Sequence, residues 1–205
     1  MEVALTPSLA QARELPGDKA ARIVEAMRVA VAARGTAGAT FDVVAREAGV
    51  SRGLLHYYFG TKERLLIEVV RRECDVRIER LEQAIAGAGS PEDVLAALVS
   101  TFEDFLGEGP APAVMFFEMM MLGQRNDEIA AEMAELARRI RTHLADALRS
   151  KSRAGVLELR ADPDTVATFL FALADGVTVR RLCEPEFDIA SVLEQAVVAA
   201  RAVLV

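Results

Sequence analysis

The sequence contains no tryptophan, only two histidines and two cysteines, and few aromatic residues, which make up 5% of its 205 residues. This scarcity of aromatic residues, together with abundant alanine, leucine, valine and glutamate, favours helices over sheets. Cys74 and Cys183 lie far apart in the chain, so the reducing cytoplasm is the simplest context, with a disulfide or redox pair as the alternative.

Long apolar runs are also missing. A membrane-spanning helix needs about 18 or more consecutive apolar residues. The nearest approach is the segment APAVMFFEMMMLG, and Glu118 interrupts it. The first residues, MEVALTPSLAQARELPG, lack the basic start and apolar run of a secretory signal. We therefore expect a cytoplasmic protein with no membrane association.

The charge is unevenly distributed along the chain. The net formal charge is −7, which argues against a nucleic-acid-binding protein when it is taken as an average. Between Asp18 and Arg72, however, ten lysines and arginines outnumber six aspartates and glutamates, which leaves about +4 there and about −11 elsewhere. A basic segment joined to an acidic one indicates that the basic segment meets an anion, although a window of this size also fluctuates by chance.

Apolar residues recur at helical spacing through most of the chain, and no segment shows the alternation of a strand. We predict an all-α fold of about nine helices. The first runs from Asp18 to Gly35, and Thr40, Ser51 and Thr61 cap the next three. A further helix is expected to begin near Arg72 and to reach Ala86. The remaining helices are predicted over residues 91–106, 112–123, 127–153 and 163–183, and from Asp188 to the C-terminus.

The stretch Gly49-Val50-Ser51-Arg52-Gly53 allows two interpretations. It matches G-x-S-x-G, which in hydrolases places a nucleophilic serine on a strand-to-helix turn. The sequence before Gly49 has helical rather than strand character, and His56 lies on the same short helix as Ser51, which suits no catalytic triad. The hydrolase interpretation is therefore disfavoured.

The same residues fit a helix-turn-helix, which needs two short helices joined by a tight turn containing glycine. Gly49 is suited to the turn because glycine adopts positive φ at little cost, and Ser51 is suited to capping the second helix. On that helix Leu55 and Phe59 share one face. The outer side carries Arg52, Gly53, His56 and Tyr57, a set that could face a DNA groove.

The run TFDVVAREAGVSRGLLHYYFGTKERLL, from Thr40 to Leu66, strongly resembles the DNA-binding signature of the TetR family of bacterial transcriptional regulators. The resemblance extends from about Arg22 to Leu66, and His56 stands where the family usually has tyrosine. It implies a flexible arm over residues 1–17, a helix-turn-helix DNA-binding domain over 18–66, and a ligand-binding and dimerisation domain over 67–205.

Carried over position by position, the resemblance implies that Thr40 and Lys62 hold phosphates. It also implies that Arg52, Gly53, His56 and Tyr57 face the groove. Arg52 is the candidate for a bidentate guanine contact, with a phosphate contact or a solvated side chain as the alternative. Ser51 is expected to cap its helix and to lie at the DNA surface.

For the remainder of the chain the resemblance implies a homodimer formed by the last two helices, and hence a palindromic double-stranded DNA operator. It also implies a pocket for a small apolar or amphipathic effector, to which methionine-rich surfaces adapt well. The candidate pocket residues are Phe102, Phe105, Met115, Phe116, Met119 and Phe169, with plain core packing as the alternative role. Glu118 and His143 are possible polar anchors, although His143 lacks the spacing of a metal site, and no cofactor or metal is expected.

Together these observations predict a ligand-responsive DNA-binding regulator, a repressor released from its operator by an effector, and not an enzyme. Two alternatives remain at this point. The first is an all-α enzyme or small-molecule carrier that retains a helix-turn-helix segment, and the second is a protein–protein adaptor that uses the same helices.

Overall fold

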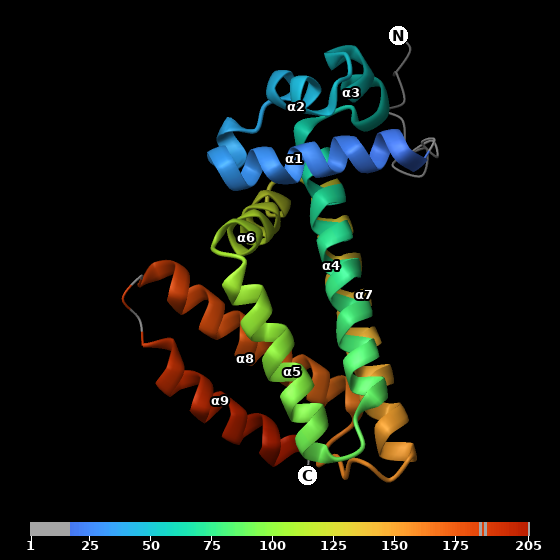
Figure 1. The fold of residues 1–205 in the computed structure, drawn as a ribbon, viewed down its shortest axis with the longest axis vertical. Coiled ribbons are helices and arrows are strands. Elements are labelled where there is room, and N and C mark those ends of the chain that lie inside the picture. The colour runs from blue at the N-terminus through green and yellow to red at the C-terminus, as the bar shows by residue number, and fades with distance from the viewer. Residues whose placement is uncertain (1–16, 185, 187, 205) are drawn as a thin grey trace. The chain divides into compact units, whose positions relative to one another are not determined.

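The computed structural model describes residues 17–184, 186 and 188–204, and the predicted N-terminal arm lies almost entirely outside them. Helices account for nearly all of this described part, as predicted, and no strand occurs in it (Figure 1). The helices are α1 (Gly17–Gly38), α2 (Phe41–Ala48), α3 (Arg52–Phe59), α4 (Lys62–Gly87), α5 (Pro91–Gly107), α6 (Ala111–Gly123), α7 (Asp127–Arg153), α8 (Pro163–Cys183) and α9 (Ile189–Leu204).

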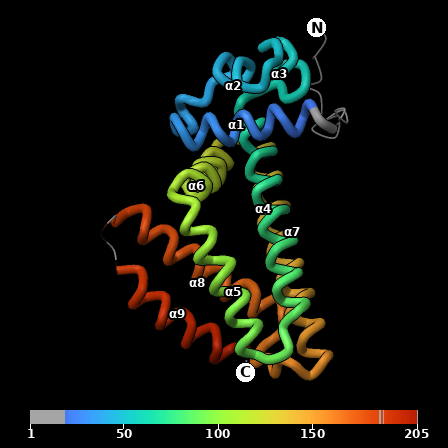
Figure 2. Tube along the Cα trace, viewed as in Figure 1, coloured from blue at the N-terminus to red at the C-terminus, as the bar shows by residue number. Residues whose placement is uncertain are grey.

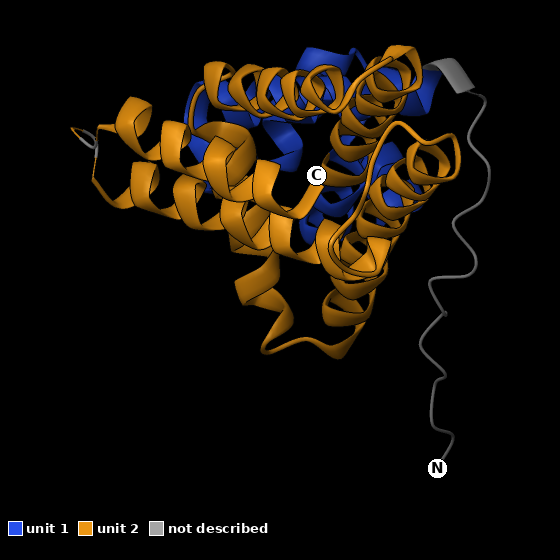
Figure 3. Cartoon of the chain, turned by 90° about the horizontal axis from the view of Figure 1, so that it is seen from below, with its two compact units in different colours: residues 1–69 blue, residues 70–205 orange. Residues whose placement is uncertain are grey.

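The chain divides into two compact units, coloured separately in Figure 3. The first ends at Val69 and is called the head below. The second, Val70–Val205, is called the body. The boundary falls inside α4, so this helix is shared by both units.

Predicted helix boundaries were confirmed in most places and wrong at one. No second helix begins near Arg72, because α4 continues without a break to Gly87. The sequence there has no glycine or proline to interrupt the backbone hydrogen bonds. At the end of α1, Gly35 leaves the helical conformation as expected, with φ 68° and ψ 170°, and a few more residues continue the helix to Gly38.

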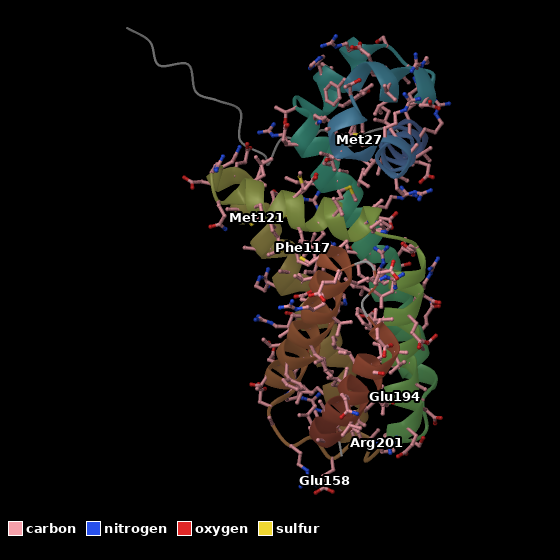
Figure 4. The ribbon with its side chains drawn as sticks, turned by 90° about the vertical axis from the view of Figure 1, so that its left-hand side faces the viewer. Met27, Phe117, Met121, Glu158, Glu194 and Arg201 are labelled. Atoms are coloured by element: carbon pink, nitrogen blue, oxygen red, sulfur yellow. The ribbon has the colours of Figure 1, made fainter. Side chains whose placement is uncertain are left out.

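The head has its own apolar core. Ile23, Met27 and Val31 of α1 are buried there, at the helical spacing seen in the sequence (Figure 4 labels Met27). Val44 of α2 and Leu55 of α3 are fully buried within the same unit. Burying these side chains determines which sides of the short helices α2 and α3 remain exposed.

The body buries a second cluster contributed by five of its helices. Its fully buried members include Val94 of α5, Leu148 of α7 and Leu204 of α9. Figure 2 shows the tubes of α8 and α9, two helices that contact each other. Within the described residues, no helix is long and apolar enough to cross a membrane.

The contact between α6 and α7 depends on a glycine. A Cβ atom on Gly123, the last residue of α6, would lie 3.1 Å from Cα of Ala130 and 3.3 Å from its backbone nitrogen. Backbone atoms of a helix cannot easily move aside, so the two helices approach this closely only because residue 123 has no side chain.

We expect Gly123→Ala to lower the free energy of unfolding by about 1–3 kcal/mol through overpacking. Gly87→Ala is the matched control. Gly87 also ends a helix, but its added Cβ would meet nothing within 4 Å, so that variant should be neutral or slightly stabilised. Urea unfolding of the two variants measures the difference. Equal stabilities would show that α6 can shift away from α7 at little cost.

Candidate DNA-binding and effector sites

The first candidate site is the α2–turn–α3 segment of the head. Thr40 accepts a hydrogen bond at Oγ1 from the backbone N–H of Val43 (3.4 Å), and so caps α2. Gly49 follows α2 in the left-handed conformation, with φ 66° and ψ 38°, which favours glycine. Ser51 then accepts a hydrogen bond at Oγ from the N–H of Leu54 (3.3 Å) and caps α3.

This geometry answers the question raised by the G-x-S-x-G match. Ser51 lies between two helices, where a nucleophile elbow would require a preceding strand. Its hydroxyl serves as a helix cap, and the motif is the turn of a helix-turn-helix.

The outer side of α3 presents the predicted residues to solvent. Arg52, Gly53, His56 and Tyr57 are all exposed, and the side of the helix that carries Leu55 is buried. Tyr57 is 63% exposed, which is unusual for a large aromatic side chain. Tyr58 and Phe59 are half-buried.

Arg52 is held by two neighbours in this unit. Its guanidinium forms an ion pair with Asp42 of α2 (Nη1 to Oδ2, 3.2 Å), and its Nε donates to Nε2 of His56 (3.4 Å). Nδ1 of His56 in turn lies 3.2 Å from the carbonyl oxygen of Gly60. These two contacts fit the tautomer that carries its hydrogen on Nδ1. A base contact by Arg52 would therefore compete with an exposed ion pair, which is a weak interaction.

Lys62 begins α4, and its ammonium group donates to the carbonyl oxygen of Thr36 (2.9 Å). The side chain is half-buried, so it connects the start of α4 to the end of α1. Thr40, by contrast, is exposed.

The second candidate site is a cavity of about 800 Å³ within the body, called the body cavity below. Side chains from α4, α5, α6, α7, α8 and α9 line it, and most of them are apolar. A volume of this size accommodates a drug-sized ligand.

Four of the six predicted pocket residues line the body cavity, namely Phe102, Phe105, Met115 and Phe116. The rings of Phe102 and Phe105 stack with their centroids 6.4 Å apart. The other two predicted residues do not line it. Met119 is buried in packing, and Phe169 is 40% exposed on a different side of α8.

Of the two polar anchors expected from the sequence, one lines the body cavity and the other does not. Glu118 is exposed and does not line the body cavity, whereas His143 lines it and pairs with Glu82 through Nδ1. Asp175 also lines the cavity, and partial desolvation of its carboxyl raises its pKa. Within the described residues, no group of three or more His, Cys, Asp or Glu side chains could hold a metal ion.

Sequence reasoning missed the arginines of the body cavity. Arg77 of α4 pairs with Glu73 and Glu108, and its guanidinium carbon lies 5.0 Å from the ring centroid of Phe105. Arg141 of α7 also lines the cavity. A signal for Arg141 existed in the sequence, because it lies four residues after Ala137 and three before Leu144, in line with an apolar stripe.

Two sequence families match this chain. Residues 23–69 match "Bacterial regulatory proteins, tetR family", and residues 91–204 match "BetI-type transcriptional repressor, C-terminal". The HTH-type transcriptional regulator BetI of Rhizobium meliloti (strain 1021) is 30% identical over 169 residues, covering 81% of this chain and 78% of that protein.

Solved structures share the fold. FadR of Bacillus subtilis, in complex with stearoyl-CoA, aligns with a TM-score of 0.70 at 21% identity and covers 89% of this chain and 97% of its own. A transcriptional regulator of Saccharomonospora viridis, in complex with choline, aligns with a TM-score of 0.67 at 22% identity. The alignment covers 88% of this chain and 94% of that protein.

A helix-turn-helix head joined to a helical body with an internal cavity defines a class of DNA-binding transcriptional regulators. Within that class the chain belongs to the TetR family, and its body is of the BetI type. Members of this family are transcriptional regulators and not enzymes, so the enzyme, carrier and adaptor alternatives are not favoured.

One wall of the body cavity contains Cys74, and burial raises the pKa of its thiol to about 11. The thiolate is the reactive form, so at pH 8 its population should be about a hundredfold smaller than that of an ordinary thiol. We expect iodoacetamide to alkylate the exposed Cys183 first and Cys74 only after unfolding in urea. Peptide mass spectrometry over time measures both rates. Equal rates in the folded protein would contradict the protection of Cys74.

Proposed function

We propose that this regulator is a repressor that binds a palindromic operator as a homodimer and leaves the operator when a small effector occupies the body cavity. The observation that carries the proposal is the exposed outer side of α3, which presents Arg52, Gly53, His56 and Tyr57 from a capped helix-turn-helix. Residues 18–66 would form the DNA-binding domain and residues 67–205 the ligand-binding and dimerisation domain.

On the DNA, Arg52 would leave Asp42 and donate two hydrogen bonds to a guanine in the major groove. Gly53, which has no side chain, would allow α3 to approach the bases closely. His56 and Tyr57 would contact the groove beside it. Ser51, Thr40 and Lys62 would contact phosphates at the starts of α3, α2 and α4, where free backbone N–H groups also favour anions.

The homodimer would form through α8 and α9. One side of α8 exposes Phe169 and Val179, at 40% and 41%, with the small residues Ala172 and Gly176 at helical spacing between them. On α9, Val198 is 62% exposed, between Glu194 and Arg201 (Figure 4 labels both charged residues). Exposed apolar side chains beside small residues favour close packing against a second helix pair, as in a twofold-symmetric interface.

The effector would act by favouring one of two arrangements of the dimer. Such a switch requires only that the ligand binds one state more tightly than the other. Because α4 lines the body cavity and its first residues belong to the head, a displacement of its body portion would reach the end of the DNA-binding domain. The regulators of known structure named above bind ligands as different as stearoyl-CoA and choline, so the fold alone does not select the effector.

Arg52→Ala should weaken operator binding by roughly 1–3 kcal/mol and relax the base preference at one operator position, because it removes a guanine contact. The control is Arg28→Ala, which removes the same charge from α1 of the head, where Arg28 pairs with Glu25 (2.6 Å). The measurement is selection from a random duplex pool with wild type and both variants, followed by affinity titrations at several salt concentrations. If Arg52→Ala leaves base preference unchanged, Arg52 does not read a base.

Val179→Glu should disrupt the homodimer, because the carboxylate would lose its water on association, at a cost on the order of 2–4 kcal/mol per interface. Val76→Glu on α4 is matched in exposure, 40% against 41%, and should leave the dimer intact. Sedimentation equilibrium over a range of protein concentrations gives both dissociation constants. Equal dimer dissociation constants for the two variants would show that this side of α8 lies outside the interface.

A further inference from the structure

Arg141 occupies an unusual position for a charged residue. The residues of α7 that line the body cavity recur at helical spacing, and Ala134, Ala137, Leu144 and Ala147 are among them. Arg141 lies in the middle of this stripe and lines the cavity itself. A cationic side chain thus takes a place where the helical pattern otherwise supplies small or apolar residues.

Most other charges around the body cavity are neutralised by neighbours. Arg77 pairs with Glu73 and with Glu108, and Glu82 pairs with His143. Arg138, one turn before Arg141 on α7, pairs with Glu135 at the exposed side of the helix (Nε to Oε2, 3.1 Å). These groups therefore have less need of a ligand to complete their interactions.

Arg141 differs from them. Among the described residues, no hydrogen bond or ion pair engages its guanidinium, and its Nε is buried without a partner. The Nε of Arg77 is buried without a partner as well, but Nη2 of Arg77 pairs with two carboxylates. A buried donor of a charged group that makes no hydrogen bond is costly. A ligand that carries a negative charge into the cavity would remove that cost, and the planar guanidinium suits a carboxylate or phosphate in particular.

Asp175 is the one competing feature. It also lines the body cavity, and it too has no hydrogen-bond or ion-pair partner within the described part of the chain. A cationic ligand could pair with it. Asp175 is only partly desolvated, however, and enough of the residue is exposed for water to reach it. The Nε of Arg141 is cut off from water, which makes the arginine the stronger determinant of ligand charge.

We propose that the effector is an amphipathic anion, whose acidic group binds Arg141 and whose apolar part packs against Phe102, Phe105, Met115 and Phe116. This inference rests on the proposed effector function of the body cavity. The acidic group is a carboxylate or a phosphate, since both accept the two parallel hydrogen bonds that an arginine donates.

The test compares head groups on one alkyl chain. Isothermal titration calorimetry of the full-length protein, without DNA, would use dodecanoate, dodecyl phosphate, dodecanol and dodecyltrimethylammonium, each below its critical micelle concentration. We expect at least one of the two anions to bind about 10- to 100-fold more tightly than the alcohol, because it makes charge-assisted hydrogen bonds to Arg141. The stronger of the two anions identifies the acidic group.

Variants then assign the effect to Arg141. Arg141→Met keeps an unbranched stem similar to that of arginine but removes the charged guanidinium, and it should weaken binding of the anion by about 10- to 100-fold while changing dodecanol binding by less than about threefold. Arg141→Lys should recover part of the loss. Arg138→Met is the matched control, since it removes the neighbouring lining arginine that is already paired, and it should bind like wild type.

The inference would be overturned if the alcohol bound as tightly as both anions, if the ammonium compound bound most tightly, or if none of the four bound. Loss of anion and alcohol binding by equal factors in Arg141→Met would also overturn it. The head-group comparison uses wild-type protein, so it remains decisive even if a variant fails to fold.

Operator release is scored separately with the best-binding anion. An anion that binds through Arg141 without releasing DNA would contradict the proposed switch and leave the site intact. Release that is equally strong in Arg141→Met would contradict the site and leave the switch intact.

Discussion

The body depends on the spacing between α4 and α7, two neighbouring helices that both line the body cavity. Three side-chain bridges join them in order along both helices: Arg71 to Glu132, Asp75 to Arg139, and Glu82 to His143. The residue numbers rise together on the two helices, so they run in the same direction (Figure 1). Half-exposed ion pairs contribute little stability, but they set spacing and register where apolar packing is interrupted by a cavity.

The cavity and the charges around it are consequences of the same arrangement. The cavity borders the apolar cluster that contains Leu148 and Leu204, since Leu95 and Leu144 belong to both the cluster and the cavity lining. Charged side chains from α4 and α7 line the cavity as well. Charged side chains in such a place must be paired or solvated. Nη2 of Arg77 is paired with two carboxylates although its Nε has no partner, whereas no guanidinium nitrogen of Arg141 is paired within the described residues. This difference distinguishes a structural charge from a candidate ligand contact.

In the head, the exposure of α3 follows from local caps and from burial of one side chain. Ser51 and Gly49 determine where α3 begins and how the chain turns into it. Burial of Leu55 then rotates the helix so that Arg52 and Tyr57 face outward. In the free protein Asp42 pairs with Arg52, so the guanidinium on the outer side of α3 is already engaged by a carboxylate.

The helices, the turn and the family could be predicted from the sequence, because each of these depends on residues close together in the chain. Thr40, Gly49 and Ser51 act through neighbours within four positions, and helical periodicity predicted Leu55 as core. The six pocket candidates came from the family resemblance and the apolar composition, and four of them line the body cavity. The uninterrupted α4 was the exception in the helix assignments, since the apolar pattern alone did not show that it continues past Arg72.

Which side of a helix faces a cavity, the core or solvent depends on contacts between helices that are far apart in the sequence. Met119 and Phe169 belong to apolar segments as suitable for a pocket as Met115 is, yet packing of α6 against α7 and of α8 against α9 turned them elsewhere. The pairing of His143 with Glu82 and the isolation of Arg141 likewise depend on residues about 60 positions apart or more. Helical periodicity predicts which residues share a face of a helix, but packing across the whole body determines what each face contacts.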